Sequence, residues 1–579
     1  MEKKDSSFLK NVKKTWIYVK ECKLNLIGYA SVSIIEAILG AILPIIAAKI
    51  ILNITSGLIP QLVLSALAVL LFEIVLYTMF FFKGYLYQKI YQKTLVNLQV
   101  AVARETLNLE IKEIDKSSSG LFIDRLNKDT QDISITFMEY TYWTSNIISN
   151  IGVLVAIFIL NKYLFLYAII TSISIFLINK KRISKQYELQ KNLKNLQEKK
   201  TGLTGELVRG IRDIKVLNAS NTILKQTSRK IIEASNEEIK MFNIRRIYMY
   251  LENNLRSLSD FVFIIIGCYL YSNSLLTIPT FVIIYNYQSK VKNLLTGIVQ
   301  LTEYNKKFVV SSDRIYEVIE NKTFKKETFG TLEIKKLEGN IEFDNVEFSY
   351  NNKKKIIKKM NFEISPNQKV AFVGKSGAGK TTIFNLITRL YSINKGRILI
   401  DNYNINDLTC DSLRNNMSII TQNPYIFNFS IKDNLLLAKE NATMKEIRDA
   451  CKMACIDDFI MSLPDKYDTM VGENGVILSG GQKQRLAIAR ALLMKTEIIL
   501  FDEATSALDN ETQGEIQKAI ENLKGKYTIL IVAHRLSTVI DCDKIFVVDD
   551  GKIIDCGTHK ELLIKCNSYK NLYEKDLKI

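Results

Sequence analysis

Apolar residues are concentrated in the first 300 positions of this chain, and this uneven spread limits the possible folds more than any other feature. A helix needs about 20 mostly apolar residues to cross a lipid bilayer. The apolar fraction over the whole chain, 47%, is ordinary for a soluble protein. The distribution is therefore what predicts a membrane part, with six candidate spans at 24–48, 62–82, 140–160, 163–179, 258–276 and 278–301.

Charged residues inside these spans are candidates for functional groups, because a charge in the hydrocarbon core is costly. Glu36 and Glu73 lie within the first and second spans. The sixth span is interrupted by polar groups at Asn286, Gln288, Lys290 and Lys292. These groups could line a cavity for an amphiphilic or charged cargo. They could equally pair with neighbouring helices or mark the cytosolic end of the span.

Lysine and arginine alternate with neutral turns along the membrane part. The N-terminus and the segments 83–132 and 180–256 are basic, whereas the turns near 49–61, 161–162 and 271–277 carry few basic residues. Basic loops remain in the cytoplasm. We therefore expect a multi-pass protein of the cell membrane with both termini in the cytoplasm. The net charge of +18 would also suit a nucleic-acid partner, but the basic residues cluster beside the apolar runs.

A glycine-rich run in the last 240 residues predicts a phosphate-binding loop. It lies between an apolar strand at 370–373 and a helix that begins near Thr381. Glycines let successive backbone N–H groups face phosphate oxygens, and the helix adds its positive N-terminal end. Lys380 can reach the β- and γ-phosphates, and the Thr381 hydroxyl can bind Mg²⁺. The run reads Gly374, Lys375, Ser376, Gly377, Ala378, Gly379, Lys380, Thr381, Thr382.

A second apolar run, 497–501, ends in Asp502 and Glu503. A buried strand would deliver these carboxylates to the edge of a parallel sheet, where α/β proteins bind ligands. Asp502 is the natural partner for Mg²⁺, and Glu503 is placed to polarise an attacking water.

A third motif, Leu478-Ser479-Gly480-Gly481-Gln482, precedes an alanine-rich helical run at 485–493. Ser479 can cap that helix, and the glycines expose backbone amides to an anion. The motif resembles the signature sequence of the ATP-binding-cassette family, in particular of its exporters with fused transmembrane and nucleotide-binding domains.

The resemblance implies roles for further residues. Tyr350 matches the aromatic side chain that stacks on adenine, and Gln422 matches the glutamine that serves both the metal and catalysis. Asp509 ends the segment 506–509, which is similar to the family's D-loop. His534 matches the histidine that contacts the γ-phosphate, whereas His559 is interpreted as structural.

Two cytoplasmic segments, 117–126 and 206–215, resemble the coupling helices by which exporters of this family touch their nucleotide-binding domains. Each is predicted as a short helix bounded by glycine turns. Six of the eight cysteines follow position 409, in the part that must face ATP, so we expect reduced thiols.

The predicted fold is an all-α six-helix transmembrane domain at 1–318, a linker at 319–338, and an α/β P-loop ATPase domain of the cassette type at 339–579. One P-loop and one signature per chain argue for a dimer, and the complete ATPase set favours a homodimer over a pair with a similar chain.

The predicted function is ATP-driven export, by an alternating-access translocase, of a lipid, drug-like or peptide cargo. An importer on the same scaffold and a regulated channel or receptor remain alternatives. A soluble cassette ATPase acting on nucleic acid is disfavoured by the six apolar segments.

Overall fold

The chain forms two compact units in a computed structural model that describes residues 2–55, 59–117, 119–321, 323–350, 354–472, 475–502, 510–533 and 536–576. The first unit holds 1–109 and 113–326, and the second holds 110–112 and 327–579. The change from one unit to the other falls within the segment predicted as a linker.

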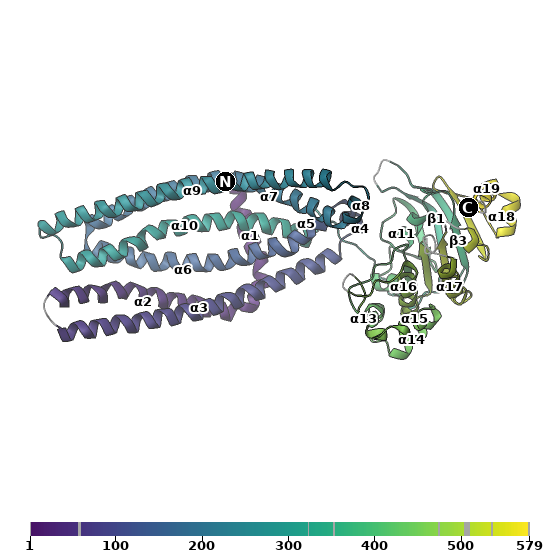
Figure 1. Ribbon diagram of the computed structural model, residues 1–579, viewed down its shortest axis with the longest axis horizontal. Helices are drawn as coiled ribbons and strands as arrows, with labels where there is room; N and C mark the ends of the chain where they lie inside the picture. Colours follow the sequence, from purple (N-terminus) through teal and green to yellow (C-terminus); the bar gives the residue numbers. More distant parts are fainter. Residues whose placement is uncertain are drawn as a thin grey trace. The chain divides into compact units, whose positions relative to one another are not determined.

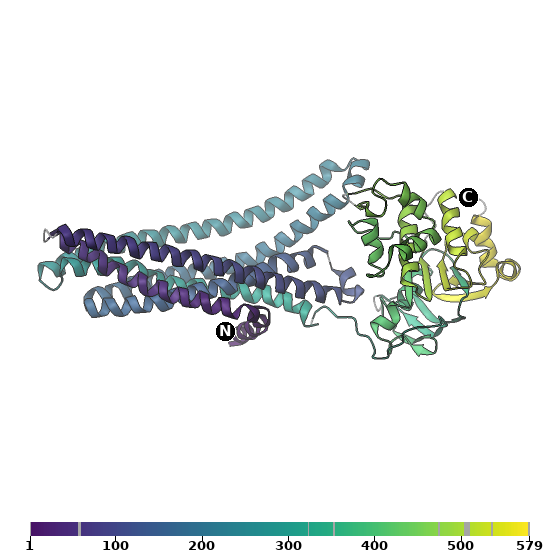
Figure 2. The ribbon, with the colours of Figure 1, turned by 90° about the horizontal axis from the view of Figure 1, so that it is seen from below.

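The first unit is helical, and six of its helices, each of 31 to 53 residues, run alongside one another (Figures 1 and 2). These long helices are α2 (Lys23–Thr55), α3 (Ile59–Leu107), α6 (Thr130–Leu160), α7 (Lys162–Arg209), α9 (Ser220–Ser272) and α10 (Ile278–Ile319). The shorter helices are α1 (Glu2–Val19), α4 (Ile111–Lys116), α5 (Ser119–Asp124) and α8 (Ile211–Val216).

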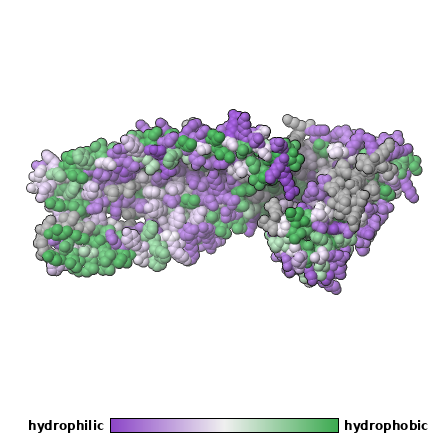
Figure 3. Space-filling view, in the orientation of Figure 1, coloured by the Kyte–Doolittle hydropathy of each residue, from purple (hydrophilic) through white to green (hydrophobic). Residues whose placement is uncertain are grey.

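Five helical segments of the described chain are long and apolar enough to cross a membrane. They are Phe8–Ile54, Ile59–Leu107, Gly120–Leu160, Lys162–Gln186 and Ser220–Ser272. Hydrophobic side chains, green in Figure 3, gather on the end of the helical unit that holds the turn between α9 and α10. The sixth long helix, α10, carries Lys290 and Lys292 among its apolar residues.

The ends of the long helices differ from the prediction at two places. Helix α2 continues to Thr55, well into the predicted turn at 49–61, because Lys49 is followed by further apolar residues. Helix α9 ends at Ser272, so the predicted fifth span ran too far toward 276. Thr277 accepts a hydrogen bond from the N–H of Thr280 and begins α10 instead.

The tight turn predicted at 161–162 is confirmed. Asn161 has an extended backbone and caps α7, its Oδ1 atom accepting from the N–H groups of Tyr163 and Leu164, each at 3.0 Å. One asparagine therefore both ends α6 and starts α7.

The two segments predicted as coupling helices both contain a short helix. A glycine precedes one of these helices and lies inside the other. Gly210 separates α7 from α8, as predicted, although 206–209 belong to the end of α7. Gly120, in contrast, lies inside α5, so the glycine turn predicted there is wrong. The ring of Phe122 lies 5.5 Å from that of Phe324, a tertiary contact that offsets the weak helix propensity of glycine.

The second unit contains two sheets. One has six strands in the order β10-β9-β3-β8-β7-β6, parallel from β9 to β6, and the other has four strands in the order β2-β1-β4-β5. The strands are β1 (Ile341–Phe348), β2 (Ile357–Ile364), β3 (Lys369–Val373), β4 (Lys395–Ile400), β5 (Tyr403–Asn404), β6 (Met417–Ile420), β7 (Ile498–Asp502), β8 (Thr528–Val532), β9 (Lys544–Asp549) and β10 (Lys552–Gly557).

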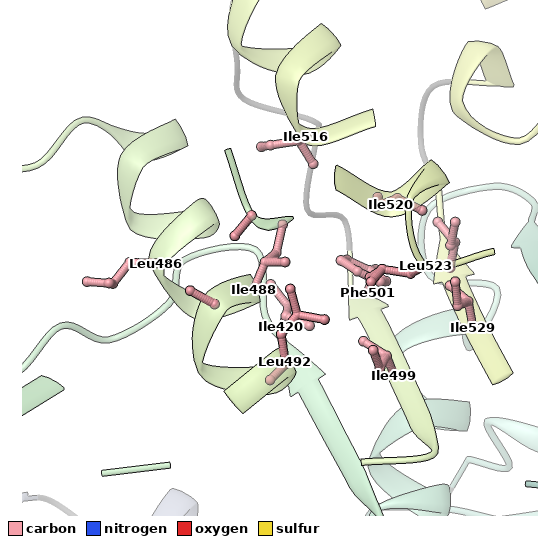
Figure 4. Close-up of a cluster of buried hydrophobic side chains, with 14 of the residues drawn as sticks. Ile420, Leu486, Ile488, Leu492, Ile499, Phe501, Ile516, Ile520, Leu523 and Ile529 are labelled. Atoms are coloured by element: carbon pink, nitrogen blue, oxygen red, sulfur yellow. The ribbon is translucent and has the colours of Figure 1, made fainter. Parts of the chain in front are cut away.

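The five parallel strands of this sheet are mostly buried, so their side chains alternate between two cores, whereas the antiparallel edge strand β10 is partly exposed. Ile499 and Phe501 of β7 face one core, and Ile498 and Leu500 face the other. Figure 4 shows side chains of α16 and α17 gathered with those of β6, β7 and β8 in the first core. The helices of this unit are α11 (Lys380–Ile387), α12 (Cys410–Arg414), α13 (Ile431–Leu436), α14 (Met444–Met453), α15 (Asp457–Ser462), α16 (Gly480–Met494), α17 (Asn510–Glu521), α18 (His559–Lys565) and α19 (Asn567–Asp576).

A buried carboxylate stabilises the packing of α14 and α15. Asp457, 4% exposed, accepts a 2.6 Å hydrogen bond from the Tyr467 hydroxyl and a 3.1 Å bond from Arg448 Nη2. Burial alone would raise the pKa of Asp457, but the bonds from Arg448 and Tyr467 outweigh it and hold the pKa below its ordinary value of 3.8.

We therefore expect the second unit to lose stability in acid. The contribution of Asp457 is fully present above pH 3.8 and is lost as the pH falls through the lowered pKa of the folded state. Asp457→Asn should cost about 1–3 kcal/mol at pH 7 and flatten the fall of the thermal midpoint as the pH drops below 3.8. The neighbouring Asp458 is exposed, so Asp458→Asn is the matched control. Equal pH profiles for the Asp457 variant and the wild type would contradict this account.

Candidate nucleotide-binding site

The glycine-rich loop joins β3 to α11, so the predicted order of strand, loop and helix is confirmed. All five residues of β3 are buried. Gly374, Gly377 and Gly379 have φ angles of +155°, +80° and +104°, which side chains rarely adopt. A Cβ atom on Gly374 would lie 2.1 Å from the carbonyl oxygen of Val548, so the loop backbone packs directly against β9. The loop is shaped by backbone conformations that favour glycine.

Lys380 lies within this loop and not in solvent. It is 4% exposed, and its Nζ atom donates to the carbonyl oxygens of Gly374 at 2.8 Å and Lys375 at 3.0 Å. These two bonds hold the ammonium group beside the first residues of the loop.

Thr381 and Asp502 meet although they are 121 residues apart. The Thr381 hydroxyl donates to Asp502 Oδ1 at 3.0 Å. Asp502 is the last residue of β7, and its side chain reaches the first turn of α11. The structure therefore brings together the hydroxyl and the carboxylate that the sequence analysis assigned to Mg²⁺.

The predicted catalytic residues follow neighbouring parallel strands. Strands β3, β8, β7 and β6 lie in this order, so their carboxyl ends share one edge of the sheet. Gln422 follows β6 by two residues, and its carbonyl oxygen accepts from Gln484 Nε2 of α16 at 3.1 Å. Glu503, Asp509 and His534 lie outside the described residues.

Tyr350 lies beside the first turn of α11. Its hydroxyl is 3.2 Å from Thr382 Oγ1 and accepts from Asn385 Nδ2 at 3.3 Å. Its half-buried ring packs edge-to-face against Tyr391, with ring centroids 4.9 Å apart. The structure thus places the predicted adenine-stacking residue next to the phosphate-binding loop.

The signature motif begins α16, and the capping role predicted for Ser479 is confirmed. Ser479 Oγ accepts from the N–H of Gln482 at 3.3 Å, and the Ser479 N–H donates to Gln482 Oε1 at 2.8 Å. This reciprocal pair holds the first turn, while Ser479 and Gly480 are exposed and Gly481 is buried. The side-chain amide of Gln482 is thereby occupied by a hydrogen bond within its own chain.

His559 is structural, as interpreted. It begins α18 after the capping residue Thr558, and its Nδ1 atom lies 2.8 Å from the hydroxyl of the buried Tyr569.

Sequence reasoning missed two residues of the site. Asn385 holds the hydroxyl of Tyr350, and Gln484, 2% exposed, holds the main chain at Gln422. Gln484 carries a signal that could have found it, because it is a polar residue on the buried face of an alanine-rich helix. The position of Asn385 depends on how β1 packs against α11, which local sequence does not specify.

The chemistry of these residues fits a nucleotide and its metal. The loop offers backbone N–H groups, a buried ammonium and the N-terminus of α11, all of which attract phosphate oxygens. Thr381 and Asp502 offer oxygen ligands of the kind that Mg²⁺ prefers. A Cβ atom on Gly377 would meet no atom of the described residues within 4 Å, so the loop is open on this side.

Comparisons with known proteins agree over both units. Residues 26–291 match the family described as "ABC transporter transmembrane region", and residues 357–506 match "ABC transporter". The chain is 32% identical, over 491 residues, to an "ATP-dependent lipid A-core flippase" of Blochmanniella pennsylvanica (strain BPEN), covering 83% of each chain. The chain belongs to the ABC transporter family. It is therefore a multi-pass membrane protein that binds ATP and couples its hydrolysis to transmembrane transport.

Two further likenesses concern parts of the protein or its fold. A "Putative multidrug export ATP-binding/permease protein" of Staphylococcus aureus (strain NCTC 8325 / PS 47) is 47% identical over 260 residues, which is 45% of each chain. A solved structure described as "Structure of a bacterial Atm1-family ABC exporter with ATP bound" has a TM-score of 0.84 over 96% of this chain and 98% of that one, at 24% identity. At this identity the second likeness supports the fold alone.

Proposed function

We propose that this ABC transporter is an exporter of a lipid, drug-like or peptide cargo. The names of its relatives, a lipid A-core flippase and a putative multidrug export protein, support export. The observation that carries the proposal is the contact of Thr381 with Asp502 beside the glycine-rich loop, in a chain whose other unit is a bundle of long apolar helices.

The proposed chemistry divides among the residues of the second unit. Lys380 and the loop N–H groups bind the phosphates, and Tyr350 receives the adenine. Thr381, Asp502 and Gln422 would hold Mg²⁺, which supplies positive charge to the phosphate oxygens. Glu503 orients the attacking water and draws its proton, and His534 contacts the γ-phosphate. Catalysis then consists mainly of positioning and charge stabilisation.

We propose that two chains act together. In the family, the signature of one chain closes over the ATP bound by the other, and this chain carries one of each motif. Ser479 and Gly481 of one subunit would close over the site of Lys380 in its partner, with Asp509 near the interface. The presence of Glu503 favours a homodimer, and a pair with a similar half-transporter is the second candidate.

Closure of the dimer would turn the cargo path outward because ATP binds the closed state more tightly. Helices α5 and α8 are the proposed coupling helices. The alternation of basic segments supports cytoplasmic termini in the cell membrane. An importer on the same scaffold would use the same chemistry with the opposite direction of cargo.

A vesicle experiment tests the direction. The purified chain is reconstituted with its ATPase units facing outward, together with a headgroup-labelled fluorescent lipid or an apolar fluorescent dye. We expect ATP to drive at least one probe into the vesicle lumen or inner leaflet, which corresponds to export from the cell. ATP-driven movement in the other direction would establish the importer, and hydrolysis that moves neither probe would count against a cargo of these two classes.

A further inference from the structure

Lys83, Lys290 and Lys292 lie on the long helices of the bundle, and two of these lysines have a carboxylate partner. Lys83 of α3 lies 2.6 Å from Glu36 of α2, and its side chain is 10% exposed. Lys292 of α10 lies 2.6 Å from Asp260 of α9, and its side chain is 3% exposed. Each of these pairs joins two helices and cancels its own charge, so neither leaves a positive charge for another partner.

Lys290 of α10 differs from both. Its Nζ atom donates to the backbone carbonyl oxygen of Gly40 in α2 at 2.5 Å. Among the described residues, no carboxylate lies within 4.0 Å of this ammonium group. An ammonium group carries three donors and a full charge, whereas one carbonyl oxygen supplies a single neutral acceptor. Lys290 therefore has capacity for an anion.

A charged ammonium group at the depth of Lys290 in the membrane costs free energy. Helix α10 begins at Ile278, and a rise of 1.5 Å per residue places Lys290 about 18 Å further along the helix. The hydrocarbon core is about 30 Å thick, so a helix that starts at the outer surface carries Lys290 inside the core. Cations at such positions are retained where they meet an ion or a substrate.

The helices that meet at Lys290 carry polar and aromatic groups about two turns away from it. Ser33, Glu36 and Gly40 share one face of α2, and the buried hydroxyl of Ser33 makes no hydrogen bond to any residue that the structure describes. Two turns beyond Lys290, Gly297 packs under Trp143 of α6, where a Cβ atom would lie 3.1 Å from the indole ring. A cation, a hydroxyl and an aromatic ring on neighbouring helices suit a molecule with both a charged and an apolar part.

We propose that Lys290 binds the acidic group of the transported molecule, so that the cargo is an amphipathic anion with a carboxylate or phosphate head on an apolar body. This inference rests on the proposed export function and names its substrate class. The carbonyl of Gly40 holds the ammonium group in place until the anion displaces it.

The test measures binding without ATP. The chain has two tryptophans, so a Trp16→Phe background leaves Trp143 as a fluorescent reporter on the helix that packs against Gly297. The protein is placed in phosphatidylcholine nanodiscs and titrated with dodecyl phosphate or with the neutral dodecyl maltoside. We expect dodecyl phosphate to bind more tightly, and Lys290→Gln to weaken that binding about ten-fold or more, because it removes a charged hydrogen bond.

Two variants control for structure and for charge. Lys290→Arg keeps the charge and is expected to retain most of the binding. Lys89→Gln removes one charge from an exposed position on α3 and is expected to bind dodecyl phosphate as the wild type does. Equal affinity of the wild type and Lys290→Gln for dodecyl phosphate would overturn the proposal. Equal weakening for the neutral probe would also overturn it and leave Lys290 as a tether between α2 and α10.

A further arm identifies the source of the anion. Phosphatidylglycerol replaces part of the phosphatidylcholine in the discs, and the titration is repeated. Competition by phosphatidylglycerol that disappears in Lys290→Gln assigns the site to a lipid headgroup, whereas no competition assigns it to a free single-chain amphiphile. Because binding is read without nucleotide, failure of the vesicle transport experiment above is distinguishable from failure of this site.

Discussion

Glu503→Gln should bind ATP normally and hydrolyse it at least 10²-fold more slowly than the wild type. The amide has the size of the carboxylate, so it leaves the phosphate contacts of Lys380 intact, but it cannot draw a proton from the attacking water. General-base catalysis typically contributes 10²–10⁴-fold in rate. Glu503 is the next residue in the sequence after Asp502, whose side chain contacts Thr381.

The measurement is single-turnover hydrolysis together with nucleotide binding. Because ATP is bound and not consumed, the variant should also accumulate as a closed dimer, which size-exclusion chromatography with and without ATP would detect. Glu497→Gln is the matched control, since Glu497 precedes the same strand at its opposite end and pairs with Lys336 at 3.2 Å. Wild-type turnover in Glu503→Gln would remove this residue from the mechanism.

Lys380→Ala should weaken nucleotide binding by about 10²-fold or more. Lys380 supplies a buried ammonium, and each hydrogen bond from a charged group contributes about 1.5–3 kcal/mol. The substitution also removes the bonds to the carbonyl oxygens of Gly374 and Lys375, which loosens the loop itself. Both effects act in the same direction on affinity.

Binding of a fluorescent ATP analogue and steady-state hydrolysis together check this prediction. Lys445→Ala, an exposed lysine in the first turn of α14, controls for the loss of one positive charge. Unfolding of the Lys380 variant is monitored by its thermal midpoint, so that lost binding is not confused with a lost fold. An affinity and a rate like those of the wild type would contradict the assignment of the phosphate-binding loop.

Local sequence predicted the second unit well because its signals are local. The glycines at 374, 377 and 379 adopt positive φ angles, and the predicted strand at 370–373 matches β3 to within one residue. Ser479 caps α16 because the N–H group that donates to its hydroxyl belongs to Gln482, three residues away. Such patterns depend on residues close together in the chain, so they can be recognised without knowledge of the fold.

Helix ends in the first unit were less predictable. Apolar composition indicates that a helix can cross a bilayer, but it does not fix the residue at which the helix ends. The extension of α2 to Thr55 is an example. Gly120 was expected to end a helix and lies inside α5, where a contact between Phe122 and Phe324 opposes the local preference. Tertiary packing decided the outcome at Gly120, whereas the apolar residues after Lys49 extend α2.

The sequence by itself determined the family of the chain, its membrane half and the glycine-rich loop between a strand and a helix, since hydropathy and motif spacing are local properties. Only the tertiary structure decided that Thr381 meets Asp502 across 121 residues, and that Lys83 and Lys292 have carboxylate partners while Lys290 meets a carbonyl. The physical reason is that the free energy of a charge depends on which groups surround it in space, and these groups come from helices and strands far apart in the chain.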